Sequence, residues 1–301
     1  PSGFLFNHEG IIYRQVNRDY ADKFDHLIDS GLYDFLIDRG LLIQHEEVEK
    51  EAPDPTNAYK VILPEQIAFI SYPYEWCFSQ LKSAALATLE IQNIALKFGM
   101  TLKDSSAYNI QFIHGKPILI DTLSFDIYQE GLPWDAYRQF CQHFLAPLAL
   151  MSKVDVRLSQ LLRNYIDGIP LDLASQLLPW QTRINPSLLL HIHVHSSAQR
   201  HYSDKKVEKS TVSRQMSKTQ MLGLIDSLKT GVKKLKWQPA GTEWVNYYEA
   251  ADHYSDQAAQ HKKEIVSGFL DRIQFTSVWD LGANQGAFSR LASDRGIPTL
   301  A

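Results

Sequence analysis

Apolar and polar positions in the first third of the chain alternate between strand-like and helix-like periods. Two apolar runs, 3–6 and 11–16, flank a polar turn and predict a β-hairpin closed at Gly10. A helical stripe runs from Ala21 to Ile37 and is interrupted by Gly31, which predicts two helices or one broken helix. Further short apolar runs predict strands at 41–43, 59–63 and 67–72. The acidic, proline-containing stretch between the first two of these runs predicts a solvated loop.

The rest of the chain is mainly patterned for helices. Ser79 to Phe98 has the broadest apolar face and ends at Gly99. Further helical patterns occupy 135–151, 156–166, 171–178, 186–190, 221–235 and 255–272. This succession of strands followed by helices predicts an α+β domain in the N-terminal two thirds of the chain.

A candidate catalytic segment follows the long helix. Asp104 is separated from Asn109 by four residues, and a predicted hairpin then leads into an apolar strand that ends at Asp121. This order resembles the catalytic segment of protein-kinase-like and aminoglycoside-phosphotransferase-like folds. The resemblance implies that Asp104 accepts the substrate's hydroxyl proton, while Asn109 and Asp121 hold magnesium on the phosphates of ATP.

The segment departs from the kinase pattern at several points. Asp104 lacks a preceding His-Arg or His-Gly pair, and Thr122-Leu123 stands where Phe-Gly follows the second Asp. Neither a glycine-rich phosphate loop nor the usual Val-Ala-Ile-Lys strand is present, although Arg14 or Lys60 is available to replace the lysine. Three alternatives therefore stay open: a phosphotransferase, a degenerate kinase-like module that binds substrate, and a hairpin with purely local turn hydrogen bonds.

Two further features suggest binding sites of other kinds. The stretch 199–236 is rich in Lys and Arg, which suits either an anionic partner or a solvated linker. Aromatic residues are not interleaved with these charges, so we expect a linker and no nucleic-acid partner. His191, His193 and His195 have metal-site spacing, but neither Cys nor an acidic residue lies nearby in the sequence. We therefore expect packing histidines and no metal.

The last stretch of the chain has the pattern of a strand, a glycine turn and a helix. Ser277 to Leu281 is apolar and β-prone, Gly282 and Gly286 bracket a turn, and residues 287–292 have helical spacing. This order begins a nucleotide-type βαβ unit, in which missing side chains let a ligand approach the backbone. The alternative is a plain strand-turn-helix corner without a ligand.

The sequence Asp-Leu-Gly-Ala-Asn-Gln-Gly at 280–286 resembles the first motif of class I S-adenosylmethionine-dependent methyltransferases. Asn284 stands at the middle position of that motif, where glycine is commonest. It differs from the Gly-x-Gly-x-x-Gly fingerprint, which argues against a nicotinamide cofactor. Together with the motifs at 72–76 and 120–125, it resembles the methyltransferases related to a rhizobial nodulation protein. The resemblance implies that the cofactor S-adenosylmethionine contacts the strand end and turn at Asp280, Gly282, Ala283, Asn284 and Gly286. It assigns no catalytic residue and does not identify the methyl acceptor.

Composition sets the remaining expectations. A net charge of −4, only two cysteines, and the absence of a membrane-length apolar run predict a cytoplasmic protein without a membrane partner. We predict three parts: a kinase-like α+β domain at 1–198, a basic linker and helix at 199–240, and the start of a Rossmann-like α/β methyltransferase domain at 241–301. Because the sequence stops where a second strand would begin, we expect a fragment of a longer methyltransferase, inactive by itself.

Overall fold

The structure is a computed structural model that describes residues 1–194, 215–238 and 255–301. It divides into two compact units, Pro1–Trp237 and Gln238–Ala301, and each is described by itself. The domain boundaries predicted at 198/199 and 240/241 lie outside the described residues. In the described parts of the chain, no helix is long and apolar enough to cross a lipid bilayer.

The first unit begins with a four-stranded antiparallel sheet in the order β1-β2-β4-β3. Its strands are β1 (Gly3–His8), β2 (Ile11–Asn17), β3 (His45–Glu47) and β4 (Ala58–Pro64). The predicted hairpin is confirmed, with Glu9 and Gly10 both at positive φ in the turn. The loop predicted over the acidic stretch is wrong at β3, because pairing with β4 uses backbone groups and leaves polar side chains at an edge.

Two short helices follow the hairpin, α1 (Ala21–Asp29) and α2 (Leu32–Asp38). Gly31 lies between them at φ 80°, so the interrupted stripe forms two helices. A small core under the sheet contains residues from β2, the 3-10 turn Arg18–Tyr20, α1, β4 and the 3-10 turn Thr122–Ser124: Val16, Tyr20, Phe24, Ile62 and Leu123. Leu123 thus ties the sheet to the candidate catalytic segment.

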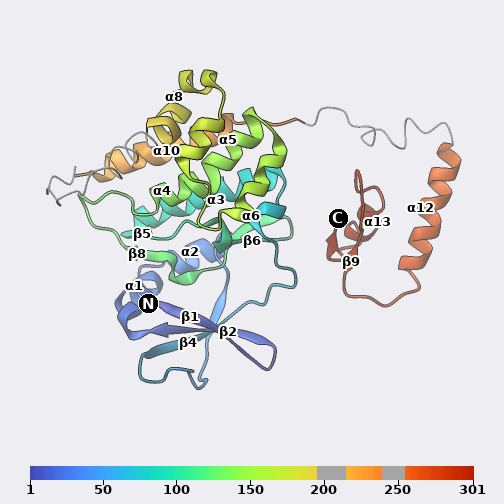
Figure 1. Ribbon diagram of the computed structural model, residues 1–301. Helices are drawn as coiled ribbons and strands as arrows, with labels where there is room; N and C mark the ends of the chain where they lie inside the picture. The colour runs from blue at the N-terminus through green and yellow to red at the C-terminus, as the bar shows by residue number, and fades with distance from the viewer. Residues whose placement is uncertain (195–214, 239–254) are drawn as a thin grey trace. The chain divides into compact units, whose positions relative to one another are not determined.

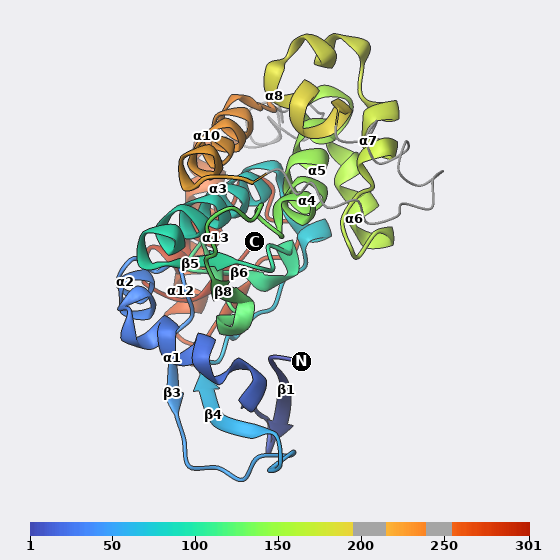
Figure 2. The same cartoon turned by 90° about the vertical axis from the view of Figure 1, so that its left-hand side faces the viewer.

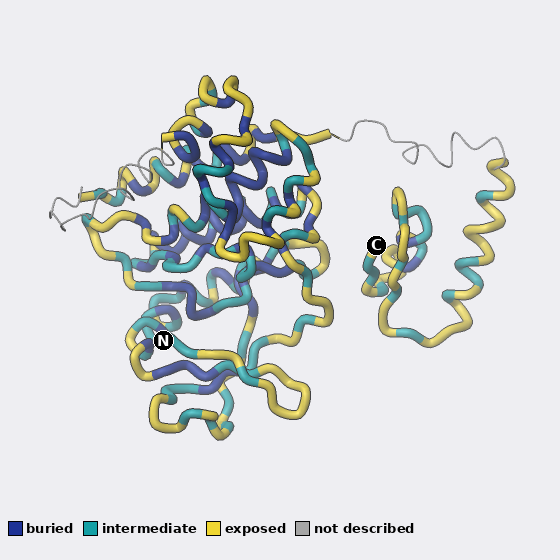
Figure 3. Tube along the Cα trace, viewed as in Figure 1, coloured by how far each residue is buried: buried dark blue, intermediate teal, exposed yellow. Residues whose placement is uncertain are grey.

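The larger core belongs to the helical part of the first unit (Figures 1, 2 and 3). Helix α3 (Phe78–Ala95) crosses its middle and is buried over most of its circumference. Two antiparallel strand pairs follow: β5 (Met100–Leu102) with β8 (Phe125–Ile127), and β6 (Ile110–Ile113) with β7 (Lys116–Leu119). The remaining α- and π-helices up to residue 194 are α4 (Tyr137–Phe140), a π-helix (Cys141–Leu145), α5 (Ala146–Lys153), α6 (Leu161–Asn164), α7 (Leu171–Leu177), α8 (Pro186–Leu188) and a second π-helix (Leu189–Val194), with 3-10 helices at Val156–Gln160 and Trp180–Ile184.

Two of the predicted strands are corrected by the structure. The run 41–43 contributes only a single parallel bridge, between Leu42 and Leu119. The run 67–72 forms no strand, and the backbone of Ser71 is instead bonded by the Gln111 side chain: Nε2 donates to the Ser71 carbonyl, and Oε1 accepts from the Ser71 amide.

Helix α10 (Lys218–Lys234) completes the first unit and packs against α3. Its buried face comprises Met221, Ile225, Leu228, Gly231 and Val232. Ser217 accepts a hydrogen bond from the Gln220 amide in a capping box at the N-terminus of the helix. The basic lysines of this region therefore lie on a packed helix whose apolar face belongs to the core.

The second unit contains α12 (Asp256–Leu270), β9 (Val278–Trp279), α13 (Ser289–Ser293) and β10 (Thr299–Leu300). Strands β9 and β10 pair in parallel, as a βαβ unit requires. The chain is thus a mixed α+β protein with an N-terminal antiparallel sheet followed by helices. Its described residues contain no broader parallel sheet of the Rossmann type.

Candidate functional sites

The predicted glycine corner lies between β9 and α13 and has a left-handed backbone. Gly282, Asn284 and Gly286 have φ values of 83°, 51° and 71°. Asn tolerates this region better than most residues, so the departure from the commonest glycine fits the local geometry. The amide of Gly286 donates to the Ala283 carbonyl at 2.8 Å, which closes the turn.

Asp280, at the end of β9, is held in place by the helix that follows the turn. Its carboxylate Oδ2 accepts a hydrogen bond from Ser289 Oγ at 2.6 Å, and Ser289 is buried. Its backbone amide donates to the Leu300 carbonyl at 2.8 Å. The strand end, the turn and the start of α13 are therefore fixed to one another around this carboxylate.

The corner is open on the side of Gly282. A Cβ placed on Gly282 meets nothing within 4 Å, and the neighbouring Leu281 is 88 % exposed. The five predicted cofactor-binding residues thus lie together at the strand end and the turn after it, where Gly282 and Asn284 are exposed and Asp280, Ala283 and Gly286 are half-buried. This arrangement fits a ligand that lies over the strand end, because no protein atom fills the space a side chain would take.

The candidate catalytic segment of the first unit brings Asn109 and Asp121 together. Asp121 caps a 3-10 turn at Thr122–Ser124, with Oδ1 accepting from the Leu123 amide at 3.0 Å and Oδ2 from Ser124 Oγ at 2.9 Å. Asn109 Nδ2 donates to the same Ser124 Oγ at 3.3 Å. Ser124 therefore joins the two residues, and no pattern in the sequence predicts this link.

Asp104 has a different set of partners. Its Oδ1 accepts from the Ser106 amide at 2.9 Å and from Gln139 Nε2 at 2.8 Å. Gln139 Oε1 also accepts from the Ser105 amide at 2.7 Å, so this α4 side chain holds the whole loop. Among the described residues, neither a hydrogen bond nor an ion pair joins Asp104 to Asp121, although the Lys103 amide donates to the Ser124 carbonyl at 2.9 Å.

Of the two cations available to replace the missing lysine, only Arg14 lies at the site. Arg14, on β2, forms an ion pair with Asp121 through Nη1 and Oδ1, and their side chains are only 15 % and 19 % exposed. Lys60 on β4 instead pairs with Glu47 on the neighbouring edge strand β3, at 2.7 Å. Arg14 lies 107 residues from Asp121 in the sequence, so the pattern along β2 does not predict this partner.

The histidines near the end of the helical part are buried packing residues. His191 Nδ1 lies 2.8 Å from Tyr137 Oη, and its Nε2 lies 2.9 Å from Ser227 Oγ on α10. His193 lies 2.8 Å from Ser175 Oγ and 2.9 Å from Thr182 Oγ1. These polar contacts occupy the ring nitrogens, while His195 lies outside the described residues.

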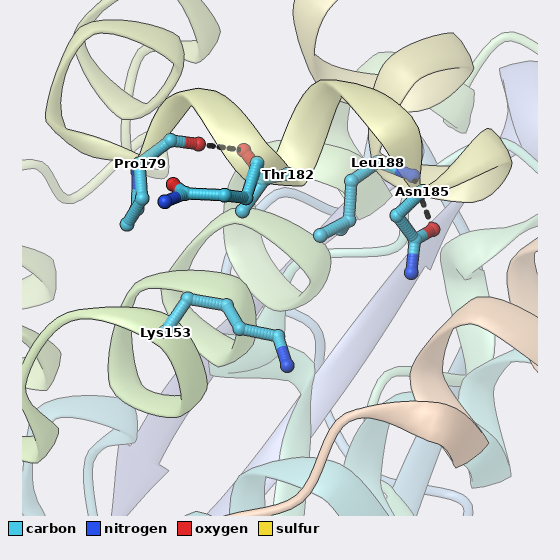
Figure 4. A pocket seen from close by; sticks show the side chains of 6 residues that line it. Lys153, Pro179, Thr182, Asn185 and Leu188 are labelled. Carbon is cyan, nitrogen blue, oxygen red and sulfur yellow. Dashed lines mark hydrogen bonds between the residues drawn. The ribbon is translucent and has the colours of Figure 1, made fainter.

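A shallow hollow of about 480 Å³ lies on the helical part, between Lys153 of α5 and the turn at Pro179–Thr182 (Figure 4). Asn185 and Leu188 line its other side. Thr182 Oγ1 donates to the Pro179 carbonyl at 2.6 Å, so this hydroxyl already has a partner. None of the predicted site residues lines this hollow.

The fold and the two candidate sites thus define a mixed α+β protein with a polar segment around Asp121 in one unit and a glycine corner in the other. No model of a known protein family matches the sequence. The chain is homologous to nodulation protein NoeA of Rhizobium meliloti (strain 1021), with 29 % identity over 300 residues. The alignment covers 98 % of this chain and 63 % of that protein, so the chain spans less than two thirds of its relative's length.

Proposed function

We propose that the protein is an S-adenosylmethionine-dependent methyltransferase, or the N-terminal portion of one, acting on an acceptor that the sequence does not identify. The observation that carries this proposal is the left-handed turn at Gly282, Asn284 and Gly286, placed between a parallel strand pair and a helix. The homology to NoeA over nearly the whole chain is compatible with it, since the resemblance to methyltransferases related to a nodulation protein also spans nearly the whole chain.

In this proposal the cofactor supplies the activated methyl group, and the corner binds and orients it. Asp280 offers a carboxylate to the amino or hydroxyl groups of the cofactor, and Ser289 keeps that carboxylate facing the turn. Gly282, Ala283, Asn284 and Gly286 present backbone at close range. Rate enhancement then comes from proximity and alignment of the acceptor with the methyl group.

The test is calorimetry of S-adenosylhomocysteine with the full-length polypeptide. We expect saturable binding that Gly282→Val abolishes, because the new side chain would occupy the space left for the ligand. Gly296→Val is the matched control: Gly296 has φ 77° and an equally open surrounding, but it lies in the turn before β10. Its backbone strain is therefore similar and its position is away from the corner.

Two results would refute the methyltransferase. One is a wild-type protein that does not bind S-adenosylhomocysteine. The other is an equal loss of affinity in both glycine variants, since backbone strain alone would then explain it.

We infer a second candidate function for the first unit, as a kinase-like phosphotransferase or a degenerate kinase-like module that binds substrate. It is favoured by the joining of Asn109 and Asp121 through Ser124, next to the loop that carries Asp104. A degenerate module without phosphate binding predicts no effect of magnesium and ATP, whereas a phosphotransferase predicts that they raise the melting temperature of the intact protein. Asp121→Ala should abolish that rise.

A further inference from the structure

The ion pair between Arg14 and Asp121 is one of several contacts that satisfy the Asp121 carboxylate, and it does not depend on the methyltransferase proposal. Asp121 is the residue that a kinase-like reaction would use to ligate magnesium. Each of its oxygens already has a partner: Oδ1 has the Arg14 guanidinium and the Leu123 amide, and Oδ2 has the Ser124 hydroxyl. A guanidinium carries a fixed positive charge and several donors, so it satisfies a carboxylate without metal.

Other contacts also join the N-terminal part of the first unit to the segment 103–126. Lys103 Nζ donates to Ser2 Oγ at 2.7 Å, and Tyr20 Oη donates to the Phe125 carbonyl at 2.7 Å. Lys23 pairs with Asp126 at 2.7 Å. Each contact joins the N-terminal sheet and α1 to the segment 103–126, on which the candidate catalytic residues lie.

Apolar packing also holds these two parts of the first unit together. Leu123 is buried in the small core beneath the sheet, between β2 and α1. A Cβ on Gly3 would lie 2.1 Å from the Gln15 carbonyl oxygen and 2.8 Å from Leu123 Cδ1. The start of β1 thus lies directly against the turn that Asp121 caps, at a distance that only glycine permits.

The charged groups at the contact between these two parts also balance one another. Arg14, Lys23 and Lys103 are opposed by Asp104, Asp121 and Asp126. Burial lowers the pKa of the Lys103 ammonium, and Lys23 lowers it further, while the three carboxylates raise it. A site built for magnesium needs an excess of oxygen ligands with negative charge. The residues here do not fit that requirement.

We propose that Arg14 is a built-in cation that takes the place of a divalent metal at Asp121 and locks the N-terminal sheet to the catalytic-type segment. The first unit is then a closed, metal-independent module and not a phosphotransferase. This inference selects between the alternatives of the second candidate function and leaves the methyltransferase proposal untouched.

The test is a double-mutant cycle on the intact chain, monitored by thermal unfolding. Arg14→Met leaves a half-buried carboxylate without its cation, and Asp121→Asn keeps an oxygen for the Leu123 amide but removes the charge. We expect each single variant to lower the melting temperature by about 5 °C or more, since breaking a largely buried pair strands one charge. The double variant should lose clearly less than the sum of the two.

The matched control is the pair Lys60–Glu47 on the same sheet, with side chains 30 % and 46 % exposed. Lys60→Met and Glu47→Gln should each change the melting temperature by less than about 2 °C, because exposed pairs contribute little. Additive losses in the Arg14–Asp121 cycle would overturn the lock.

Magnesium supplies an independent readout. With magnesium and ATP together, the wild-type melting temperature should stay within about 1 °C of its value in their absence, as it should for Asp121→Asn. A rise in the wild type that Asp121→Asn abolishes would show that Asp121 is a metal ligand, and the proposal would be wrong.

Discussion

At the scale of single residues, burial without a full set of partners distinguishes His143 from the other histidines of the helical part. Its side chain is almost completely buried, and Nδ1 has no hydrogen-bond partner among the described residues. Burial lowers the pKa of His143 to about 4, and the nearby Asp104 and Asp167 only partly offset this effect. Folding therefore depends on keeping this ring neutral.

We predict an acid-sensitive contribution from His143. Its folded-state pKa lies below the unfolded value of about 6.5, so the unfolded chain binds more protons as the pH falls. The contribution is complete above pH 6.5 and is lost as the pH falls toward 4, by about 3 kcal/mol in total. His143→Leu should reduce the change in unfolding free energy between pH 7 and pH 4 by that amount in urea titrations. An unchanged pH dependence of the unfolding free energy in His143→Leu would contradict the prediction.

A second prediction concerns Ser289, the residue that orients Asp280. Ser289→Ala removes a hydrogen bond to a charged group and should weaken S-adenosylhomocysteine binding by the full-length protein about tenfold, or about 1.4 kcal/mol. Ser293→Ala is the control, because Ser293 Oγ donates only to the Arg290 carbonyl of its own helix. Calorimetric affinities that are equal in the two variants would rule out this role for Ser289.

At the scale of elements, α10 shows how a basic stretch becomes part of a core. Its apolar side packs on α3, and Ser152 Oγ donates to the Lys236 carbonyl beyond the helix. Lys82 of α3 donates through Nζ to the carbonyl oxygens of Lys233 and Leu235, at 2.8 and 2.7 Å. An ammonium at the C-terminus of a helix satisfies carbonyls that have no partner within the helix.

Removing this cap should loosen α10. Lys82→Met keeps the aliphatic stem and should destabilise the docked helix by about 1–2 kcal/mol. Amides in the last turns of α10 would then exchange with solvent about tenfold faster in hydrogen-exchange measurements. Lys97→Met, an exposed lysine just after α3, serves as the comparison. Equal exchange rates in both variants would show that the cap contributes nothing.

At the level of the whole molecule, the two units differ in the number of buried residues that their described parts contain. The first unit contains both hydrophobic clusters. In the described part of the second unit only Ser289 and Ala292 are buried, as the predominance of exposed and intermediate residues in Figure 3 also shows. Stability of a folded unit depends chiefly on buried apolar area, so the first unit should fold without the second.

A chain cut after Trp237 tests this expectation. Residues 1–237 should unfold cooperatively within about 3 °C of the corresponding transition of the intact chain, since no buried residue of the first unit is removed. Residues 238–301 alone should show neither near-ultraviolet ellipticity nor a cooperative melt. A cooperative transition in 238–301 would mean that its few buried residues suffice for a stable fold.

Local structure could be predicted from the amino-acid sequence wherever a residue's own chemistry decides the backbone conformation. Gly31 ended one helix, Gly10 closed the hairpin, and the turn at Gly282 and Gly286 took the left-handed conformation expected of glycine. Helices with a long apolar face, α3 above all, were also predictable, because apolar residues recur along these segments with the helical period of 3.6 residues.

Only the tertiary structure decided which distant groups meet. Arg14, and not Lys60, pairs with Asp121. Ser124 hydrogen-bonds both Asn109 and Asp121. The Gln111 side chain hydrogen-bonds the backbone of Ser71, where a strand was predicted. Strand β3 formed from polar residues because β4 offered free backbone groups at its edge. In each case the partner lies on another element, and periodicity along one segment carries no information about what will pack against it.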